Sequence, residues 1–408
     1  MLSEQSVEAA VEQKTAKKRS LKGRAPTSAE SCKPAAAPAM KIPLLDLTRK
    51  FHSIEAELRR RWEEIFSTMR LLNGANLLAF EKEFAEFCGV KHALGVACGT
   101  DAISLSLRAL NVTPGDEVIL AAHAPAPVIE PIIHMGAVPV LIDKAEADYG
   151  PDLDGLWAAI STKTKALISV HFLGLPCAMD EINRIAADRG IAVIEDASQA
   201  QGAFYRGKRA AGLGTITPMS LGPVKNLACY GDGGVVLVND DALAGSVRLQ
   251  RVHGQAEKYD HKLYGWNSRL DELQAALLRL KLPSLDYDNR RRREIADVYT
   301  LRFRDLPVTL PPTFADRQSV YHQYVIETPE RDPLKRFLEM HGVGTGIYYP
   351  LPLHQHEAWR MRGLPAYRLP ESERYGRENL ALPVFAEMTD DEVSYVADRV
   401  TQYFANRG

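Results

Sequence analysis

Four short apolar segments alternate with amphipathic ones between residues 118 and 196, and this pattern limits the fold more than any other feature of the chain. The apolar segments are VILAA (118–122), VPVLID (138–143), ALISVHFL (166–173) and IAVIED (191–196). Helical patterns lie between them, as in LDGLWAAI (153–160) and MDEINRIAADRG (179–190). Nearly continuous apolar runs are typical of parallel strands that are buried on both faces. Because strands that alternate with helices form βαβ units, we expect an α/β fold with a mostly parallel central sheet flanked by helices.

The pattern changes after Gly265. GGVVLVND (233–240) predicts one more strand, and leucines at helical spacing then indicate a long amphipathic helix that Pro283 ends. The next predicted helix begins with Arg290 to Arg293. Such a run is typical of a solvated helix face, with a phosphate or subunit contact as the alternative. The remaining residues show few strand-like segments, so we predict a large domain over residues 41–285 and a smaller C-terminal α+β domain over residues 286–408.

The first forty residues differ from the rest of the chain. Residues 1–40 contain no Phe, Tyr, Trp or Ile, and six of the eleven residues at positions 14–24 are basic. A segment of this composition cannot bury enough apolar surface to order itself. We therefore expect a flexible basic tail over residues 1–40. A nucleic-acid or membrane-surface arm, or a working chain that begins at Met40, are the alternatives.

Composition excludes several classes of protein for the chain as a whole. Lys and Arg number 50 against 52 Asp and Glu, and this balance argues against a protein whose main role is to bind nucleic acid. No apolar run approaches the roughly 20 residues of a membrane span. The five cysteines are scattered without C-x-x-C spacing, which argues against a disulfide framework or a metal site. We expect a cytoplasmic protein with no nucleic-acid or membrane partner.

Two segments of the α/β half carry polar residues where ligands commonly bind. Gly99, Thr100 and Asp101 precede a helical pattern, and the free N–H groups of a helix N-terminus suit a phosphate. Asp196 directly follows a predicted strand, at the edge of the sheet where open α/β folds bind ligands. Its carboxylate could hold a pyridinium N–H. Taken singly, each of these features is more often an ordinary helix cap.

Lys225 lies between apolar residues and a glycine-rich turn. Desolvation lowers the pKa of an amine, as a Schiff-base nucleophile requires. Ser220 precedes it by five residues and offers a hydroxyl to the same phosphate. A solvated loop is the alternative for a lone lysine beside glycines. Together, a phosphate cradle, a pyridinium partner and a desolvated lysine on a βαβ scaffold are the parts of a pyridoxal-phosphate enzyme.

At these residues the sequence resembles the nucleotide-sugar aminotransferases of the DegT/StrS type, within fold-type I of the pyridoxal-phosphate enzymes. The resemblance runs from about Ile42 to about Val400. The matching stretches are IPLLDL (42–47), GTDAISLSLRAL (99–110), GDEVIL (115–120), EDASQAQGA (195–203), SLGPVKNLACYGDGG (220–234), GWNSRLDELQAA (265–276), YHQYVI (321–326) and YYPLPLH (348–354).

The resemblance implies a role for each matching residue. Lys225 would form the Schiff base with pyridoxal 5′-phosphate and move the proton, and Asp196 would bind the pyridine nitrogen. Gln199 would lie near the phenolic oxygen of the cofactor. The residues implied in phosphate binding are Gly99, Thr100, Asp101 and Ser220, together with Asn267, which would reach the cofactor of the neighbouring subunit. The implied assembly is a homodimer with shared active sites. No metal is implied.

The implied reaction moves an amino group from glutamate to a keto sugar that is linked to a nucleotide. His171 also matches a family position, where we expect a hydrogen-bonded core histidine. Ala124 and Pro125 stand where the family commonly has a Thr-aromatic pair, and offset ring contacts are worth about 0.5–1.5 kcal/mol. His123 is one candidate to stack in place of that ring.

Leu221 and Val224 also depart from the usual lysine motif, where an aromatic residue and a threonine are common. These departures leave two alternatives open. One is a pyridoxal-phosphate enzyme of the same fold that acts on a non-sugar substrate, or that catalyses dehydration or oxidation in a secondary-metabolite pathway. The other is a non-catalytic sensor protein, which we would expect to lack Lys225 or Asp196.

Overall fold

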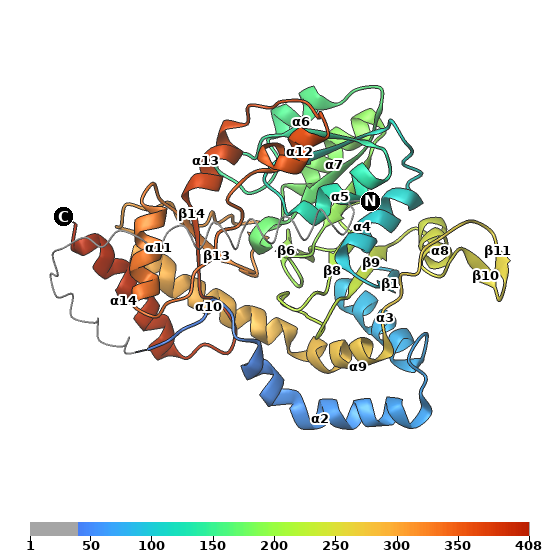
Figure 1. Cartoon of the computed structure of the whole chain (residues 1–408), viewed down its shortest axis with the longest axis horizontal. Coiled ribbons are helices and arrows are strands. Elements are labelled where there is room, and N and C mark those ends of the chain that lie inside the picture. Colours follow the sequence, from blue (N-terminus) through green and yellow to red (C-terminus); the bar gives the residue numbers. More distant parts are fainter. Residues whose placement is uncertain (1–39, 408) are drawn as a thin grey trace, which may run out of the picture. The chain divides into compact units, whose positions relative to one another are not determined.

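The computed structural model describes residues 40–407, so the predicted tail lies outside the described residues apart from Met40. The four predicted apolar strands form one parallel sheet in the order β3 (Val138–Ile142), β2 (Glu117–Ala121), β4 (Thr164–Val170) and β5 (Ala192–Asp196). Figure 1 shows helices packed around this part of the chain. The predicted strands and their parallel pairing are confirmed.

A second group of strands continues this sheet beyond β5. It has the order β1 (His92–Val96), β9 (Gly234–Val238) and β8 (Thr217–Ser220), and β9 is antiparallel to both neighbours. The Glu195 N–H donates to the Ile216 carbonyl at 3.0 Å, and Ile194 forms a parallel bridge with Ile216. Of these seven strands β9 alone runs against the others, so the predicted mostly parallel sheet is confirmed.

The alternation of side chains along the strands buries both faces of the sheet. Val118, Leu120 and Ile168 belong to a core that includes α4 (Gly99–Ala109) and α5 (Ala126–His134). Ile119 and Leu167 belong to a different core with α6 (Leu153–Ala159) and α7 (Met179–Arg189). Successive residues of a strand point to opposite faces, so helices cover both sides and leave only the strand ends open for a site.

The helices after the sheet correct one sequence-based expectation. α9 (Glu272–Lys281) ends at a short turn that contains Pro283, and α10 (Leu285–Phe303) begins before the arginine run and not at it. Within that run Arg292 is buried, and its guanidinium donates to the Val384 carbonyl at 2.7 Å. The expectation of a wholly solvated arginine face is therefore wrong, because the C-terminal segment packs over one side of α10.

The C-terminal part has a core of its own. β13 (Tyr324–Glu327) and β14 (Asn379–Leu382) pair antiparallel, beside α11 (Arg331–Met340) and α14 (Asp390–Ala405). Tyr299 and Phe303 of α10 are buried in this core. The predicted domain boundary near residue 285 stays a prediction.

The remaining elements are shorter or peripheral. They are α2 (Leu47–Thr68), α3 (Ala75–Cys88), α8 (Asp241–Gln250), α12 (Glu357–Met361), α13 (Pro370–Glu378), β6 (Phe204–Tyr205), β7 (Lys208–Arg209), β10 (Gln255–Glu257), β11 (Asp260–His261) and β12 (Arg317–Gln318). Across residues 40–407, no helix combines the length and the apolar character that crossing a bilayer requires.

Candidate active site

A cavity of about 580 Å³ opens where the carboxyl ends of β1, β2, β5 and β8 lead into loops. Six of the eight site residues predicted from the sequence line it: Gly99, Thr100, Asp196, Gln199, Ser220 and Lys225. Asp101 and Asn267 do not line it. The carboxyl ends of strands are where open α/β sheets bind ligands, so the position agrees with the chemistry of the residues.

The N-terminus of α4 forms one wall of the cavity. The helix is capped by Cys98, whose Sγ accepts the Asp101 N–H at 3.4 Å, so Thr100 lies in the first turn and is not the cap. The first N–H groups of a helix have no partner within it. A Cβ on Gly99 would lie 2.5 Å from the Cβ of Ser220. Only glycine allows this close approach, which places the Ser220 side chain beside the positive end of the helix.

Asp196 presents one carboxylate oxygen to the cavity. Its Oδ1 accepts the N–H and the hydroxyl of Ser198, at 3.0 and 2.5 Å, in a turn that Asp-x-Ser sequences favour. No group within residues 40–407 donates to Oδ2. Burial raises the pKa of Asp196 because it disfavours the charged carboxylate. A cation or a hydrogen-bond donor at Oδ2 would stabilise that charge. Ser198 also accepts the Ser220 N–H at 2.9 Å, which ties the two strand ends together.

Glu195, the neighbouring carboxylate, points to the opposite side of the strand. It is buried, and its Oε2 accepts the N–H groups of Leu213 and Gly214. Its Oε1 lies 2.9 Å from Nε2 of His171, and Nδ1 of His171 accepts the Cys177 N–H at 3.2 Å. The histidine proton therefore sits on Nε2 and is donated to Glu195. His171 does not line the cavity and is the hydrogen-bonded core histidine that we expected.

Lys225 lies in the loop between β8 and β9. The buried side chain of Gln201 holds this loop at two points: its Nε2 donates to the Ser220 carbonyl at 2.8 Å, and its Oε1 accepts the Leu227 N–H at 2.6 Å. Burial lowers the pKa of the Lys225 amine, and the nearby charge of Asp196 opposes this effect. The lysine is thus held in place and keeps a larger neutral fraction than a solvated lysine would.

The cavity wall at the end of β2 differs from our expectation for His123. Ala124 and Pro125 line the cavity, but His123 does not. Its Nε2 accepts the Tyr349 N–H at 2.9 Å, and burial lowers its pKa to about 4. The His123 ring packs edge-on against Tyr375, with the ring centroids 4.6 Å apart. The hypothesis that His123 stacks over a bound cofactor ring is therefore wrong for this structure. The imidazole of His123 instead packs against residues of the C-terminal part.

Tyr349 supplies the aromatic side chain that the sequence reasoning missed. It lines the cavity although it lies far along the chain, within the stretch YYPLPLH. Burial raises its pKa to about 12, so its hydroxyl keeps its proton. No local pattern predicts that this residue meets Lys225. Ser198, by contrast, had a usable signal, because a serine two residues after a strand-end aspartate is typical of such turns.

Asn267 lies in a separate surface cavity. The residues around it include Gly231, Asp232 and Arg269. Asp232 lines this cavity and the one that holds Lys225, so the two are neighbours. The role of Asn267 toward a partner subunit stays a prediction. In the described part of the chain, no group of three or more His, Cys, Asp or Glu side chains could hold a metal ion.

Residues 52–401 match the DegT/DnrJ/EryC1/StrS aminotransferase family. A pleiotropic regulatory protein of Geobacillus stearothermophilus is 40% identical over 90% of this chain and 99% of its own length. The dTDP-3-amino-3,4,6-trideoxy-alpha-D-glucose transaminase of Streptomyces venezuelae is 38% identical, over 89% of this chain and 96% of its own.

Solved structures agree with these relatives. S. venezuelae DesV in complex with a ketimine intermediate has a TM-score of 0.87 and 38% identity, and the match covers 89% of this chain and 98% of that one. NtdA of Bacillus subtilis, which holds the cofactor PMP, has a TM-score of 0.83 and 27% identity over 90% and 85% of the two chains. The predicted fold type is confirmed, and so is pyridoxal 5′-phosphate as the cofactor, because aminotransferases of this family use it. The chain belongs to the DegT/DnrJ/EryC1/StrS aminotransferase family.

Proposed function

We propose that the protein transfers an amino group from glutamate to a keto sugar that is linked to a nucleotide. The observation that carries this proposal is the meeting of Lys225, Asp196, Ser220 and the start of α4 in one cavity. The acceptor class is supported by the relatives, which include a transaminase of a dTDP-linked amino sugar. Lys225 and Asp196 are both present, which argues against the non-catalytic sensor, and no observation favours dehydration, oxidation or a non-sugar acceptor.

The residues of the cavity fit the cofactor group by group. The free N–H groups of Gly99 and Thr100, with the Ser220 hydroxyl, suit a phosphate at a helix N-terminus. The Oδ2 atom of Asp196 suits a protonated ring nitrogen, because a charge-assisted hydrogen bond would satisfy an oxygen to which no group within residues 40–407 donates. When bound, pyridoxal phosphate supplies an aldehyde for an amine and a ring that accepts electrons.

The chain itself supplies proton transfer and orientation. The Lys225 Nζ is the amine that lines the cavity, and its lowered pKa lets it take a proton from a substrate carbon and return one. Gln201 keeps the lysine loop in place through both of its hydrogen bonds. Gln199 is held by its own bond to the Leu173 N–H at 2.7 Å and faces the cavity.

The holoenzyme with glutamate alone tests the donor half of this proposal. We expect one equivalent of 2-oxoglutarate per active site and a matching loss of cofactor absorbance, because the amino group stays on the cofactor. Adding nucleotide-linked keto sugars should then give an amino sugar that mass spectrometry detects. A spectrum that does not change with glutamate or any other amino donor would show that the reaction is not transamination.

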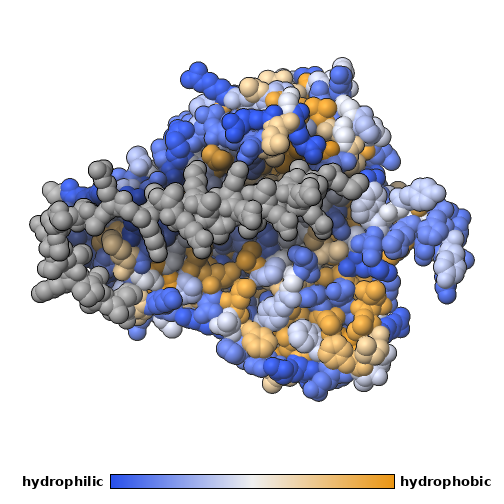
Figure 2. Space-filling view, in the orientation of Figure 1, coloured by the Kyte–Doolittle hydropathy of each residue, from blue (hydrophilic) through white to orange (hydrophobic). Residues whose placement is uncertain are grey.

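We also propose a homodimer in which each active site uses Asn267 of the partner. Figure 2 shows hydrophobic residues gathered on the surface over α2 and α3. Exposed apolar side chains in this region are Phe66, Met69, Leu71, Leu72 and Leu78. An apolar patch of this kind commonly marks a subunit interface. The surface position of Asn267 leaves its amide open to a second chain.

Mixing two inactive variants tests the shared site. Lys225→Ala and Asn267→Ala dimers should each be inactive or nearly so, but a mixed dimer has one site with both residues intact. Because about half of randomly mixed dimers are of this kind, the mixture should recover about one quarter of the wild-type activity. Recovery should fail if the two residues act within one chain. A Lys225→Ala and Asp196→Asn mixture is the matched control that should stay inactive.

The cytoplasm stays our proposed location. The four cysteines within residues 40–407, Cys88, Cys98, Cys177 and Cys229, are all free thiols. Free, mostly buried thiols are common in reducing compartments. Cell fractionation tests this assignment, and recovery of the protein from an oxidising compartment would contradict it.

A further inference from the structure

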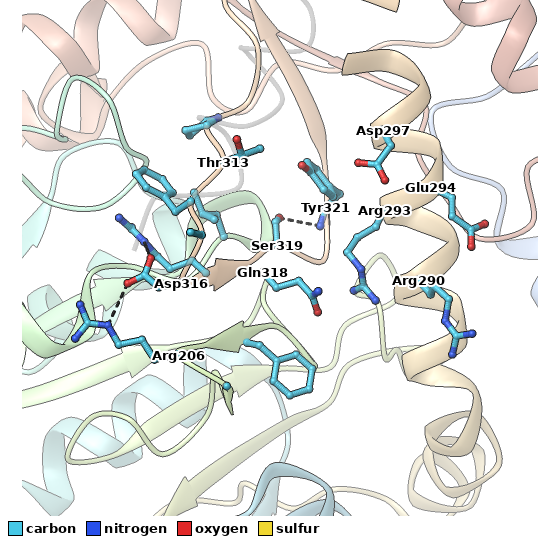
Figure 3. A pocket seen from close by; sticks show the side chains of 17 residues that line it. Arg206, Arg290, Arg293, Glu294, Asp297, Thr313, Asp316, Gln318, Ser319 and Tyr321 are labelled. Atoms are coloured by element: carbon cyan, nitrogen blue, oxygen red, sulfur yellow. Dashed lines mark hydrogen bonds and ion pairs between the residues drawn. The ribbon is translucent and has the colours of Figure 1, made fainter. Parts of the chain in front are cut away.

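A second cavity, of about 950 Å³, lies between α10, the β6–β7 hairpin and the segment over residues 312–321. Figure 3 shows side chains from these three elements around it. It shares no lining residue with the cavity that holds Lys225. The loop that carries Lys225 and the segment over residues 312–321 are in contact, because the Asn226 side chain donates to the Val320 carbonyl at 3.5 Å. Nothing in the proposed transfer reaction uses this second cavity.

Four arginines line the cavity: two form ion pairs with acidic residues, and two, called the open arginines here, form none within residues 40–407. Arg206 forms ion pairs with Asp180, Glu181 and Asp316, and Arg317 with Asp148. Arg290 and Arg293 lie three residues apart on α10, so they share a side of the helix. Within residues 40–407 neither of them has a hydrogen-bond or ion-pair partner.

Arg293 is the better placed of the two open arginines. Its side chain is half-buried, whereas Arg290 is exposed. In Figure 3 it extends from α10 toward Gln318 on the opposite wall. Burial lowers the pKa of Arg293, but a guanidinium stays charged in proteins. Asp286 and Asp297 attract this charge without forming an ion pair with it. A positive charge that is partly removed from water and has no ion-pair partner within residues 40–407 favours an anion.

Two further groups add donors to the same space. Gln318 lines the cavity with its amide. The Arg317 side chain is 9% exposed, and its Nε has no hydrogen-bond partner within residues 40–407, although the Asp316 carboxylate lies 3.7 Å from it. The acidic residues that line the cavity are Glu294, Asp297 and Asp316, and Asp316 is paired with Arg206 at 3.1 Å. Glu294 is paired with Arg291, at 3.4 Å. Of these three acids, Asp297 alone has no ion-pair partner within residues 40–407, whereas Arg290 and Arg293 both lack one. The unpaired charge of the cavity lining is therefore net positive.

We propose that this cavity binds a small-molecule oxyanion, a phosphate or a carboxylate, between Arg293 and Gln318. A guanidinium matches the two oxygens of either group. Arg290 at the rim adds attraction, and the apolar rings of Phe204 and Phe314 border the site, so the ligand has room for a carbon skeleton. The proposal does not depend on the transfer reaction.

Calorimetric titration of the cofactor-loaded enzyme tests it. Inorganic phosphate and succinate are the two probes, and the one that binds more tightly identifies the class of anion. Arg293→Gln should weaken binding by about ten- to hundredfold, the size of a lost charged hydrogen bond. Arg302→Gln is the matched control, since it removes the same charge from α10 outside the cavity, where Arg302 pairs with Asp398. That control should bind as the wild type does.

A second variant, on the opposite wall of the cavity, is needed in case Arg293→Gln does not fold. Gln318→Ala should also weaken binding, and thermal melting of each variant shows whether it is folded. No binding of either probe at millimolar concentration would overturn the proposal. So would equal affinity in wild type, Arg293→Gln and Gln318→Ala, because the anion would then sit elsewhere. The experiment measures anion binding and not catalysis. Its outcome therefore does not depend on whether the protein catalyses the proposed amino transfer.

Discussion

Lys225→Ala should reduce amino transfer by about 10³–10⁴-fold or more, with the fold intact. Among residues 40–407, Lys225 is the one amine that lines the cavity with Asp196 and Ser220, and the variant removes it. No other group there can both bond to an aldehyde and carry the proton. Single-turnover absorbance with glutamate measures the loss. Borohydride reduction followed by peptide mass analysis should place the adduct of the wild-type protein on Lys225.

Lys208→Ala is the matched control for this prediction. Lys208 is exposed on β7 and does not line the cavity, so its loss should leave the rate of amino transfer unchanged.

The rate at which the cofactor-free protein captures the cofactor gives a second measurement of the role of Lys225. The neutral form of the amine is the one that reacts with the cofactor aldehyde. Because burial lowers the pKa of Lys225, the rate of cofactor capture should rise with pH and level off below the ordinary lysine pKa of about 10.4. Lys225→Ala activity within tenfold of wild type would contradict the assigned role.

Asp196→Asn should lower the rate of amino transfer by about 10²–10³-fold and weaken binding of the cofactor, with little loss of stability. Asparagine can keep Oδ1 as the acceptor for both groups of Ser198. Its amide nitrogen would replace Oδ2 and point N–H donors at a ring nitrogen that must itself donate. Burial raises the pKa of Asp196, so the ionised form is disfavoured in the folded protein and a neutral side chain should not destabilise it.

Glu195→Gln offers a control from the adjacent position. Glu195 accepts from Leu213, Gly214 and Thr217 on the far side of the strand. An amide there leaves a buried network partly unsatisfied, which should lower the free energy of unfolding by about 2 kcal/mol. Activity per folded molecule should stay near wild type. Urea unfolding and steady-state rates separate the two effects. If Asp196→Asn lost stability and kept its rate, Asp196 would be a structural residue.

The sheet and most of the cavity could be predicted from local sequence. Apolar runs of five to eight residues specify buried strands, and the alternation with helices makes them parallel. Asp196 follows a predicted strand, at the edge of the sheet where ligands bind. The strands before Gly99 and Ser220, β1 and β8, were not predicted and were found only in the structure. Residues more than a hundred positions apart could be expected to meet because a phosphate cradle, a pyridinium partner and a desolvated lysine are the parts of one cofactor site.

Tertiary packing decided what local pattern does not encode. Tyr349 reaches the cavity, His123 turns away from it and Arg292 is buried, because the C-terminal segment folds back over β2 and α10. Arg293, one residue along, lines a second cavity and has no ion-pair partner within residues 40–407. Periodicity and capping act over a few residues, and they determined the strands, the helices and the strand-end residues of this protein. Contacts between distant segments depend on how whole surfaces fit, and only the folded chain determined those.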